Sequence, residues 1–190
     1  SGCPNDCVAA IARADLSVIG IWKDSLKIDQ EAVREYVRGG LDIKSDVCDR
    51  CPTKALTWNE NTKELEINPR DCVKCMHCIN TMPKALRPGD EKGAAILIGG
   101  KAPILQSAFL SWVIVPFWPR EKFEKPATEF KELLRKIFEW WDENAKARER
   151  VGELIYRLGM RNFLKAVGLP PAPQMVYHPR TNPYIFYERR

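Results

Sequence analysis

The stretch CVKCMHCINTMPKAL at residues 72–86 contains three cysteines, Cys72, Cys75 and Cys78, with two residues between successive members. Thiolates at this spacing are typical ligands of an iron–sulfur cluster, and a [4Fe–4S] cluster takes four of them. The position where the fourth cysteine usually stands, directly before a proline, holds Met82 instead. A cluster bound here must therefore take its fourth ligand from elsewhere in the chain.

A degenerate internal repeat indicates where that ligand is. The segment CPTKAL at 51–56 aligns with MPKAL at 82–86, which places Cys51 opposite Met82. In bacterial ferredoxins with two clusters, the cysteine before the proline ligates the cluster whose other ligands belong to the opposite half. We therefore expect one [4Fe–4S] cluster, not two, held by Cys51, Cys72, Cys75 and Cys78.

A zinc ribbon is the alternative for the same segment. Cys48 and Cys51, followed by Cys72 and Cys75, meet the C-x2-C…C-x2-C pattern of a tetrahedral zinc site. Zinc leaves Cys78 unused, whereas the cluster leaves only Cys48 unused, because the repeat places Val47 at the ligand position. The iron cluster is favoured. His77 is expected only to fill the loop.

A second cysteine pair, Cys3 and Cys7, stands at the start of the chain in SGCPNDC, before a predicted helix at 8–14. Free backbone N–H groups and the positive end of a helix dipole favour an anionic, thiolate-bound cluster. The spacing alone fits two buried thiols in a turn equally well.

The composition limits the classes of protein. The chain has 190 residues, 45% of them hydrophobic, and a net charge of +5 with interspersed signs, which does not favour nucleic-acid binding. Its seven cysteines cluster at short spacings without a visible secretory signal, which favours metal ligation over disulfides. No apolar run reaches the roughly 18 residues of a membrane span. We expect a cytoplasmic protein and, since the chain opens inside a motif without Met, a fragment or processed piece.

The remaining sequence predicts an α+β fold that positions these cysteines. Strands are expected at 16–22 and 94–100, a hairpin around 56–67, and a helix at 30–38 that Asp29 caps. Helices are expected between about 126 and 167. Their apolar stripe contains Phe130, Leu133, Leu134, Ile137, Phe138 and Trp141.

Taken together, the motifs resemble the second half of the alpha subunit of dissimilatory sulfite reductases. The resemblance covers nearly all 190 residues and rests on CPNDC, GIWKD, the cysteine stretch, RPGDE and ILIGGKAP in this order. It implies that residues 1–45 are part of a siroheme and cluster-binding domain and that residues 46–90 form a ferredoxin-like insert. It further implies return strands at 91–119 and a helical region with an extended arm at 120–190.

The resemblance also implies sites, cofactors and partners. Cys3 and Cys7 correspond to the second of two cysteine pairs that hold a [4Fe–4S] cluster beside siroheme, with Cys7 bridging the two, while the first pair is absent. The implied reaction reduces sulfite to sulfide, with the insert relaying electrons from a donor protein. The implied partner is a homologous beta subunit in an α2β2-like assembly. A single-cluster electron-transfer module without a catalytic centre is the competing interpretation.

Overall fold

The computed structural model describes residues 7–102 and 109–172. Helices and strands are mixed along the chain, which confirms the predicted α+β class. The described residues form two compact units. One contains residues 7–20 and 93–172, and the other is Ile21–Lys92.

The first unit contains a three-stranded sheet in the order β1-β6-β7. Its strands are β1 (Leu16–Trp22), β6 (Lys92–Ile98) and β7 (Trp112–Pro119), and the short helix α1 (Cys7–Ala12) precedes β1. Strand β6 pairs antiparallel with β7, and the register shifts between Ala94 and Leu97. The predicted strands at 16–22 and 94–100 correspond to β1 and most of β6.

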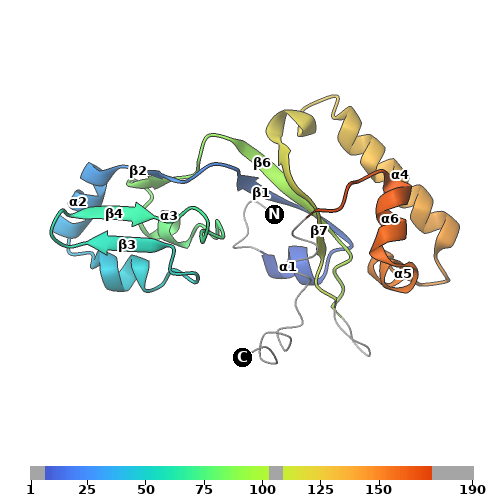
Figure 1. The fold of residues 1–190 in the computed structure, drawn as a ribbon, viewed down its shortest axis with the longest axis horizontal. Coiled ribbons are helices and arrows are strands. Elements are labelled where there is room, and N and C mark those ends of the chain that lie inside the picture. The colour runs from blue at the N-terminus through green and yellow to red at the C-terminus, as the bar shows by residue number, and fades with distance from the viewer. Residues whose placement is uncertain (1–6, 103–108, 173–190) are drawn as a thin grey trace. The chain divides into compact units, whose positions relative to one another are not determined.

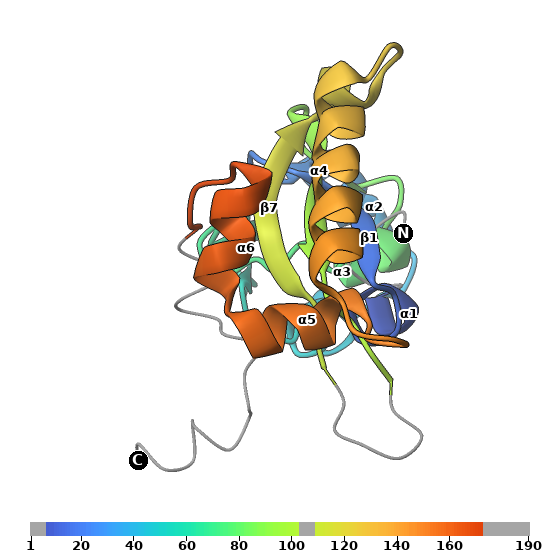
Figure 2. The same ribbon diagram turned by 90° about the vertical axis from the view of Figure 1, so that its right-hand side faces the viewer.

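Three helices complete this unit: α4 (Thr128–Asn144), α5 (Val151–Leu158) and α6 (Met160–Val167). They lie beside the sheet in Figure 2, where α4 and α6 flank β7. Side chains from β6, β7 and all three helices share one apolar core, which includes Ile98, Trp112, Ile137, Leu154 and Phe163. Burial of these side chains is what holds the helices to the sheet.

The predicted apolar stripe of α4 divides into two faces. Leu133 and Ile137 are buried, and Trp140, which the predicted stripe omitted, is buried with them. Phe138 is instead 62% exposed and Trp141 is 38% exposed. A stripe built from three- and four-residue steps is wide enough to include both tryptophans, so the sequence pattern alone does not separate the two faces.

Two glycines allow α5 to approach the end of β6. A Cβ atom on Gly152 would lie 2.3 Å from the Gly99 carbonyl oxygen, and Gly99 has a φ of +90°. Any larger residue at position 152 would push the helix away from the sheet.

The second unit combines short strands and helices (Figure 1). Its elements are β2 (Lys27–Ile28), α2 (Gln30–Arg38), a π-helical turn (Lys44–Cys48), β3 (Leu56–Asn59), β4 (Glu64–Ile67), α3 (His77–Thr81) and β5 (Leu86–Arg87). Strands β3 and β4 pair antiparallel, from Leu56 opposite Ile67 to Asn59 opposite Glu64, which is the predicted hairpin. Asp29 caps α2, since its side chain accepts from the backbone N–H groups of Glu31 and Ala32.

This unit starts at Ile21, whereas the sequence placed the start of the insert at residue 46. Strand β2 pairs with β5, and the Asp29 N–H donates to the Ala85 carbonyl. The Gln30 side chain also exchanges two hydrogen bonds with the Leu65 backbone, of 2.8 and 3.0 Å. These contacts join residues 21–45 to the cysteine segment. Across the described part of the chain, no helix combines the length and apolar character of a membrane span.

Candidate iron–sulfur site

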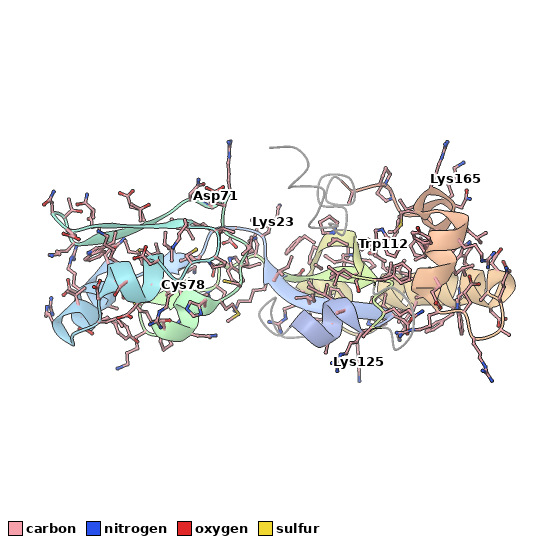
Figure 3. The ribbon with its side chains drawn as sticks, turned by 90° about the horizontal axis from the view of Figure 1, so that it is seen from below. Lys23, Asp71, Cys78, Trp112, Lys125 and Lys165 are labelled. Carbon is pink, nitrogen blue, oxygen red and sulfur yellow. The ribbon has the colours of Figure 1, made fainter. Side chains whose placement is uncertain are left out.

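The four cysteines that the repeat selected line one pocket in the second unit. Cys51, Cys72, Cys75 and Cys78 all contribute to its wall, which encloses about 410 Å³ of empty space including its open mouth. Each of the four thiols is partly buried. Cys78, on α3, is labelled in Figure 3. The structure thus brings together residues from two segments that are separated by the β3–β4 hairpin.

Local backbone geometry positions these thiols. Cys51 follows the π-helical turn, and its Sγ accepts a hydrogen bond from the Ala55 N–H at 3.3 Å. Lys74 and Met76, on either side of Cys75, have φ values of +56° and +64°. Non-glycine residues seldom adopt this left-handed conformation, and functional sites are where such backbone strain is concentrated. The strained loop turns Cys72, Cys75 and Cys78 toward a common space.

The thiols differ in acidity because their surroundings differ. Burial raises the pKa of Cys78 to about 11 and also raises the pKa of Cys72. Burial acts in the same direction on Cys51, but backbone hydrogen bonds from Ala55 and Thr53 outweigh it and hold the pKa of Cys51 below its ordinary value. Since thiolates are the ligating form, cluster binding would release protons from the buried thiols.

Cys48 belongs to the apolar core of the unit and is not part of the pocket wall. It is 7% exposed and packs in one cluster with Val47 and Met82, both fully buried. Burial raises the pKa of the Cys48 thiol to about 11, so this thiol is protonated at neutral pH. Met82, at the missing ligand position, fills the same core. The zinc-ribbon set, which requires Cys48, is therefore not the set that the pocket gathers.

Two buried nitrogen atoms at the pocket have no hydrogen-bond partner. They are Trp22 Nε1 and His77 Nε2, and they are the only buried side-chain nitrogen or oxygen atoms found without one in the described ranges. Both residues line the cysteine pocket. Buried polar atoms are normally satisfied, so these two indicate an occupant that offers hydrogen-bonding atoms. Four thiols and a tryptophan with an unpaired N–H at the wall of one pocket fit an iron–sulfur cluster, whose sulfurs are acceptors.

Among the residues that the structure describes, no three His, Cys, Asp or Glu side chains lie close enough to hold one metal ion. Tetrahedral zinc with Zn–S bonds of about 2.3 Å needs sulfurs only about 4 Å apart. A cluster is several atoms across and separates its thiolates further.

The second predicted pair is only partly within the described residues. Cys7 is the first residue of α1. Cys3 lies outside the described residues, and so does the predicted extended arm from residue 173 onward. The assignment of Cys3 and Cys7 to a siroheme-coupled cluster stays a prediction.

Trp22 and Lys74 are the site residues that sequence reasoning missed. Lys74 Nζ donates to the backbone carbonyls of Trp22 and Lys23, the latter at 3.0 Å, and lies 5.8 Å from the Trp22 ring centroid. The segment GIWKD contributed to the family resemblance, but nothing local relates Trp22 to cysteines fifty residues away. His77 was assigned to loop filling, whereas it opens α3 at the pocket wall.

The chain is similar in sequence and in structure to proteins of one known family. Residues 1–173 match the family described as the nitrite and sulphite reductase 4Fe-4S domain. The alpha subunit of the dissimilatory-type sulfite reductase of Nitratidesulfovibrio vulgaris is 48% identical over 201 residues, covering 98% of this chain and 45% of that protein. The crystal structure of dissimilatory sulfite reductase I superposes with a TM-score of 0.82 at 46% identity, over 97% of this chain and 45% of the solved one.

A beta subunit is also similar to the chain. The beta subunit of the dissimilatory-type sulfite reductase of Archaeoglobus fulgidus is 30% identical over 190 residues, covering 99% of this chain and 50% of that protein. The chain thus spans about half the length of these curated relatives.

Proposed function

The chain belongs to the nitrite and sulphite reductase 4Fe-4S domain family, with dissimilatory sulfite reductase alpha subunits as close relatives, and we propose that it forms part of an enzyme reducing sulfite to sulfide. The observation that carries the proposal is the pocket at which Cys51, Cys72, Cys75 and Cys78 meet. It supplies the redox centre that such a reductase requires.

Each set of cysteines has a distinct role in this proposal. The four pocket thiols hold a [4Fe–4S] cluster in the ferredoxin-like insert, which takes electrons from a donor protein. Cys3 and Cys7 would supply two ligands of a second [4Fe–4S] cluster, and Cys7 would also hold the siroheme. Siroheme and the clusters supply the one-electron redox chemistry at sulfite, while the protein binds, orients and tunes them.

The surroundings of the pocket suit electron relay. Trp22 is 3% exposed, and apolar residues such as Leu26, Leu56 and Ile79 complete the pocket wall. Proteins set the reduction potential of a cluster through its solvent exposure and through hydrogen bonds to its sulfur atoms.

The proposed assembly pairs the chain with a homologous beta subunit in an α2β2-like complex in the cytoplasm. Support comes from the beta subunit among the relatives and from the apolar face of α4 that contains Phe138 and Trp141. Exposed aromatic side chains of this size are typical of protein interfaces. A non-catalytic electron-transfer module would use the same pocket without needing Cys3 or Cys7.

Replacing Cys7 tests the proposed reaction. In a complete subunit containing these residues, assembled with its beta partner, Cys7→Ser should abolish sulfite reduction while the insert keeps its cluster. The reason is that electrons lose their covalent route between cluster and siroheme. Sulfide production and the electron paramagnetic resonance (EPR) signal of the insert cluster are the two measurements.

The matched control is Cys48→Ser in the same complex, which should keep its sulfide production because Cys48 lies in the apolar core. Full sulfite reduction by the Cys7→Ser complex would overturn the catalytic proposal and would favour the electron-transfer module.

A further inference from the structure

We propose that the indole N–H of Trp22 donates a hydrogen bond to a sulfur atom of the cluster held by the four pocket cysteines, and so sets its reduction potential. This inference rests on the proposed cluster site and adds to it a residue outside the cysteine motif. Trp22 lies at the end of β1, before the segment that the repeat identifies.

The first step is the unpaired state of the indole nitrogen. Trp22 is 3% exposed, and its Nε1 atom is buried without a hydrogen-bond partner. An indole N–H can only donate, so it needs an acceptor. Leaving a buried donor unpaired is costly, which makes an occupant of the pocket the natural acceptor.

The second step is the position of the ring. Trp22 lines the same pocket as Cys51, Cys72, Cys75 and Cys78. A second buried nitrogen without a partner, His77 Nε2, belongs to the same wall. Both residues with an unpaired nitrogen therefore belong to the wall of the space in which a cluster's sulfurs would lie.

The third step is that Lys74 attaches the ring to the cysteine loop. Lys74 stands between Cys72 and Cys75, and its ammonium donates to the Trp22 carbonyl and lies 5.8 Å from the Trp22 ring centroid. Loop and ring are thus held together, and the indole is fixed at one side of the pocket.

The consequence concerns the two redox states of the cluster. Reduction adds negative charge that is shared by the sulfurs, and an N–H donor stabilises the more negative state more strongly. Trp22 therefore raises the potential. Removing the N–H while keeping an aromatic ring at the same place lowers it.

The test uses the 190-residue chain loaded with iron and sulfide under reducing conditions. Trp22→Phe should keep the iron and sulfide content of the unsubstituted chain. Its reduced-to-oxidised ratio at a fixed potential should fall roughly three- to tenfold, a shift of about 30–60 mV to lower potential for a one-electron couple. EPR-monitored redox titration measures the shift. The matched control, Trp58→Phe, changes a tryptophan of the same unit that does not line the pocket, and should leave the potential unchanged.

A second measurement tests the hydrogen bond from Trp22 if the Trp22→Phe variant fails to bind iron and sulfide. With ¹⁵N-labelled indole, the reduced cluster of the unsubstituted chain should show ¹⁵N hyperfine coupling in pulsed EPR. The coupling would come from Trp22, because among the residues that the structure describes no other tryptophan lines the pocket. Absence of this coupling, or an unshifted potential in Trp22→Phe, would overturn the role of Trp22. Failure of the unsubstituted chain to bind iron and sulfide would overturn the cluster site itself.

Discussion

At the scale of single residues, Cys48 and Cys51 have opposite environments although only two residues separate them. Cys51 lines the pocket and its Sγ accepts from the Ala55 N–H, whereas Cys48 packs among apolar side chains. A ligating thiolate needs access to the metal and stabilisation of its charge, and only Cys51 has both.

We therefore expect Cys51→Ser to lose most of the iron and sulfide of the reconstituted chain, and Cys48→Ser to retain both. Cys48→Ser should lower the free energy of unfolding by roughly 1–3 kcal/mol, because its hydroxyl is buried in the core. Iron and sulfide analysis with urea unfolding measures the two effects. Equal loss of iron from both variants would contradict the register of the repeat, and zinc without sulfide in the unsubstituted chain would favour the zinc ribbon.

The repeat could separate these two cysteines in advance because ligand position is a local property of sequence spacing. The donor role proposed for Trp22 is not local. It depends on Lys74, fifty-two residues later, reaching back to the Trp22 carbonyl and ring. A contact between residues as far apart as Lys74 and Trp22 follows from how the whole unit folds. The hydrophobic periodicity of the sequence contains no signal for it.

At the scale of secondary-structure elements, Glu149 connects the end of α4 to α5. Its carboxylate accepts from Arg157 Nε and Nη2, both at 2.7 Å, and from the Lys146 N–H at 2.8 Å. The Glu149 carbonyl accepts from Trp141 Nε1 at 3.0 Å. The hydrogen bond from Arg157 is the main cause that holds the pKa of Glu149 down, from 4.5 to about 2.

Glu149→Gln should destabilise the chain at pH 7 by roughly 1 kcal/mol, since it removes a bidentate ion pair near the surface. A carboxyl whose pKa is lower in the folded state stabilises fully above its unfolded value near 4.5. That contribution is lost as the pH falls toward about 2. Urea unfolding at pH 7 and pH 3 should therefore show a smaller difference between variant and unsubstituted chain at the lower pH.

The matched control for this prediction is Glu139→Gln, which breaks an exposed pair with Arg135 on α4. It should change the free energy of unfolding by less than about 0.5 kcal/mol. A pH-independent effect of Glu149→Gln would show that the side chain acts through packing and not through its charge.

Element by element, the sequence was informative where a local rule decides the structure. Asp29 and Gly39 delimit α2 through capping, and the β-branched and aromatic residues of LSVIGIW favour the strand β1. The burial of Trp140 in place of Trp141 depends on how α4 rotates against α5, α6 and the sheet. Tertiary packing chooses between two faces that are both apolar in the sequence.

At the scale of the whole molecule, the cysteine-bearing unit starts earlier than the motifs indicate. Contacts of Gln30 with Leu65 and of Asp29 with Ala85 include α2 in the unit, although that helix contains no cysteine. The resemblance places the start of the insert at residue 46, but compactness depends on these long-range hydrogen bonds. The pocket gains Trp22 and Leu26 from residues 1–45, the segment that the resemblance assigns to the siroheme and cluster-binding domain.

Counting ligands across the chain predicts its cofactor content. A [4Fe–4S] cluster takes four thiolates, and the pocket provides Cys51, Cys72, Cys75 and Cys78. Of the other three cysteines, Cys48 is enclosed in the apolar core, so the start of the chain offers only Cys3 and Cys7 to a second cluster. Recruiting Cys48 would require dismantling that core, which includes the fully buried Val47 and Met82.

The 190-residue chain by itself should therefore bind one cluster and no siroheme, whereas the same residues within a complete subunit should bind two clusters and siroheme. Iron and sulfide analysis, together with the optical spectrum, distinguishes these states, because siroheme has bands that a cluster lacks. Cys7→Ser should leave the cluster content of the chain alone unchanged, since Cys7 lacks a full ligand set there. Tight siroheme binding by the chain alone, or a second cluster that disappears with Cys7→Ser, would show that these residues already form a complete coupled centre.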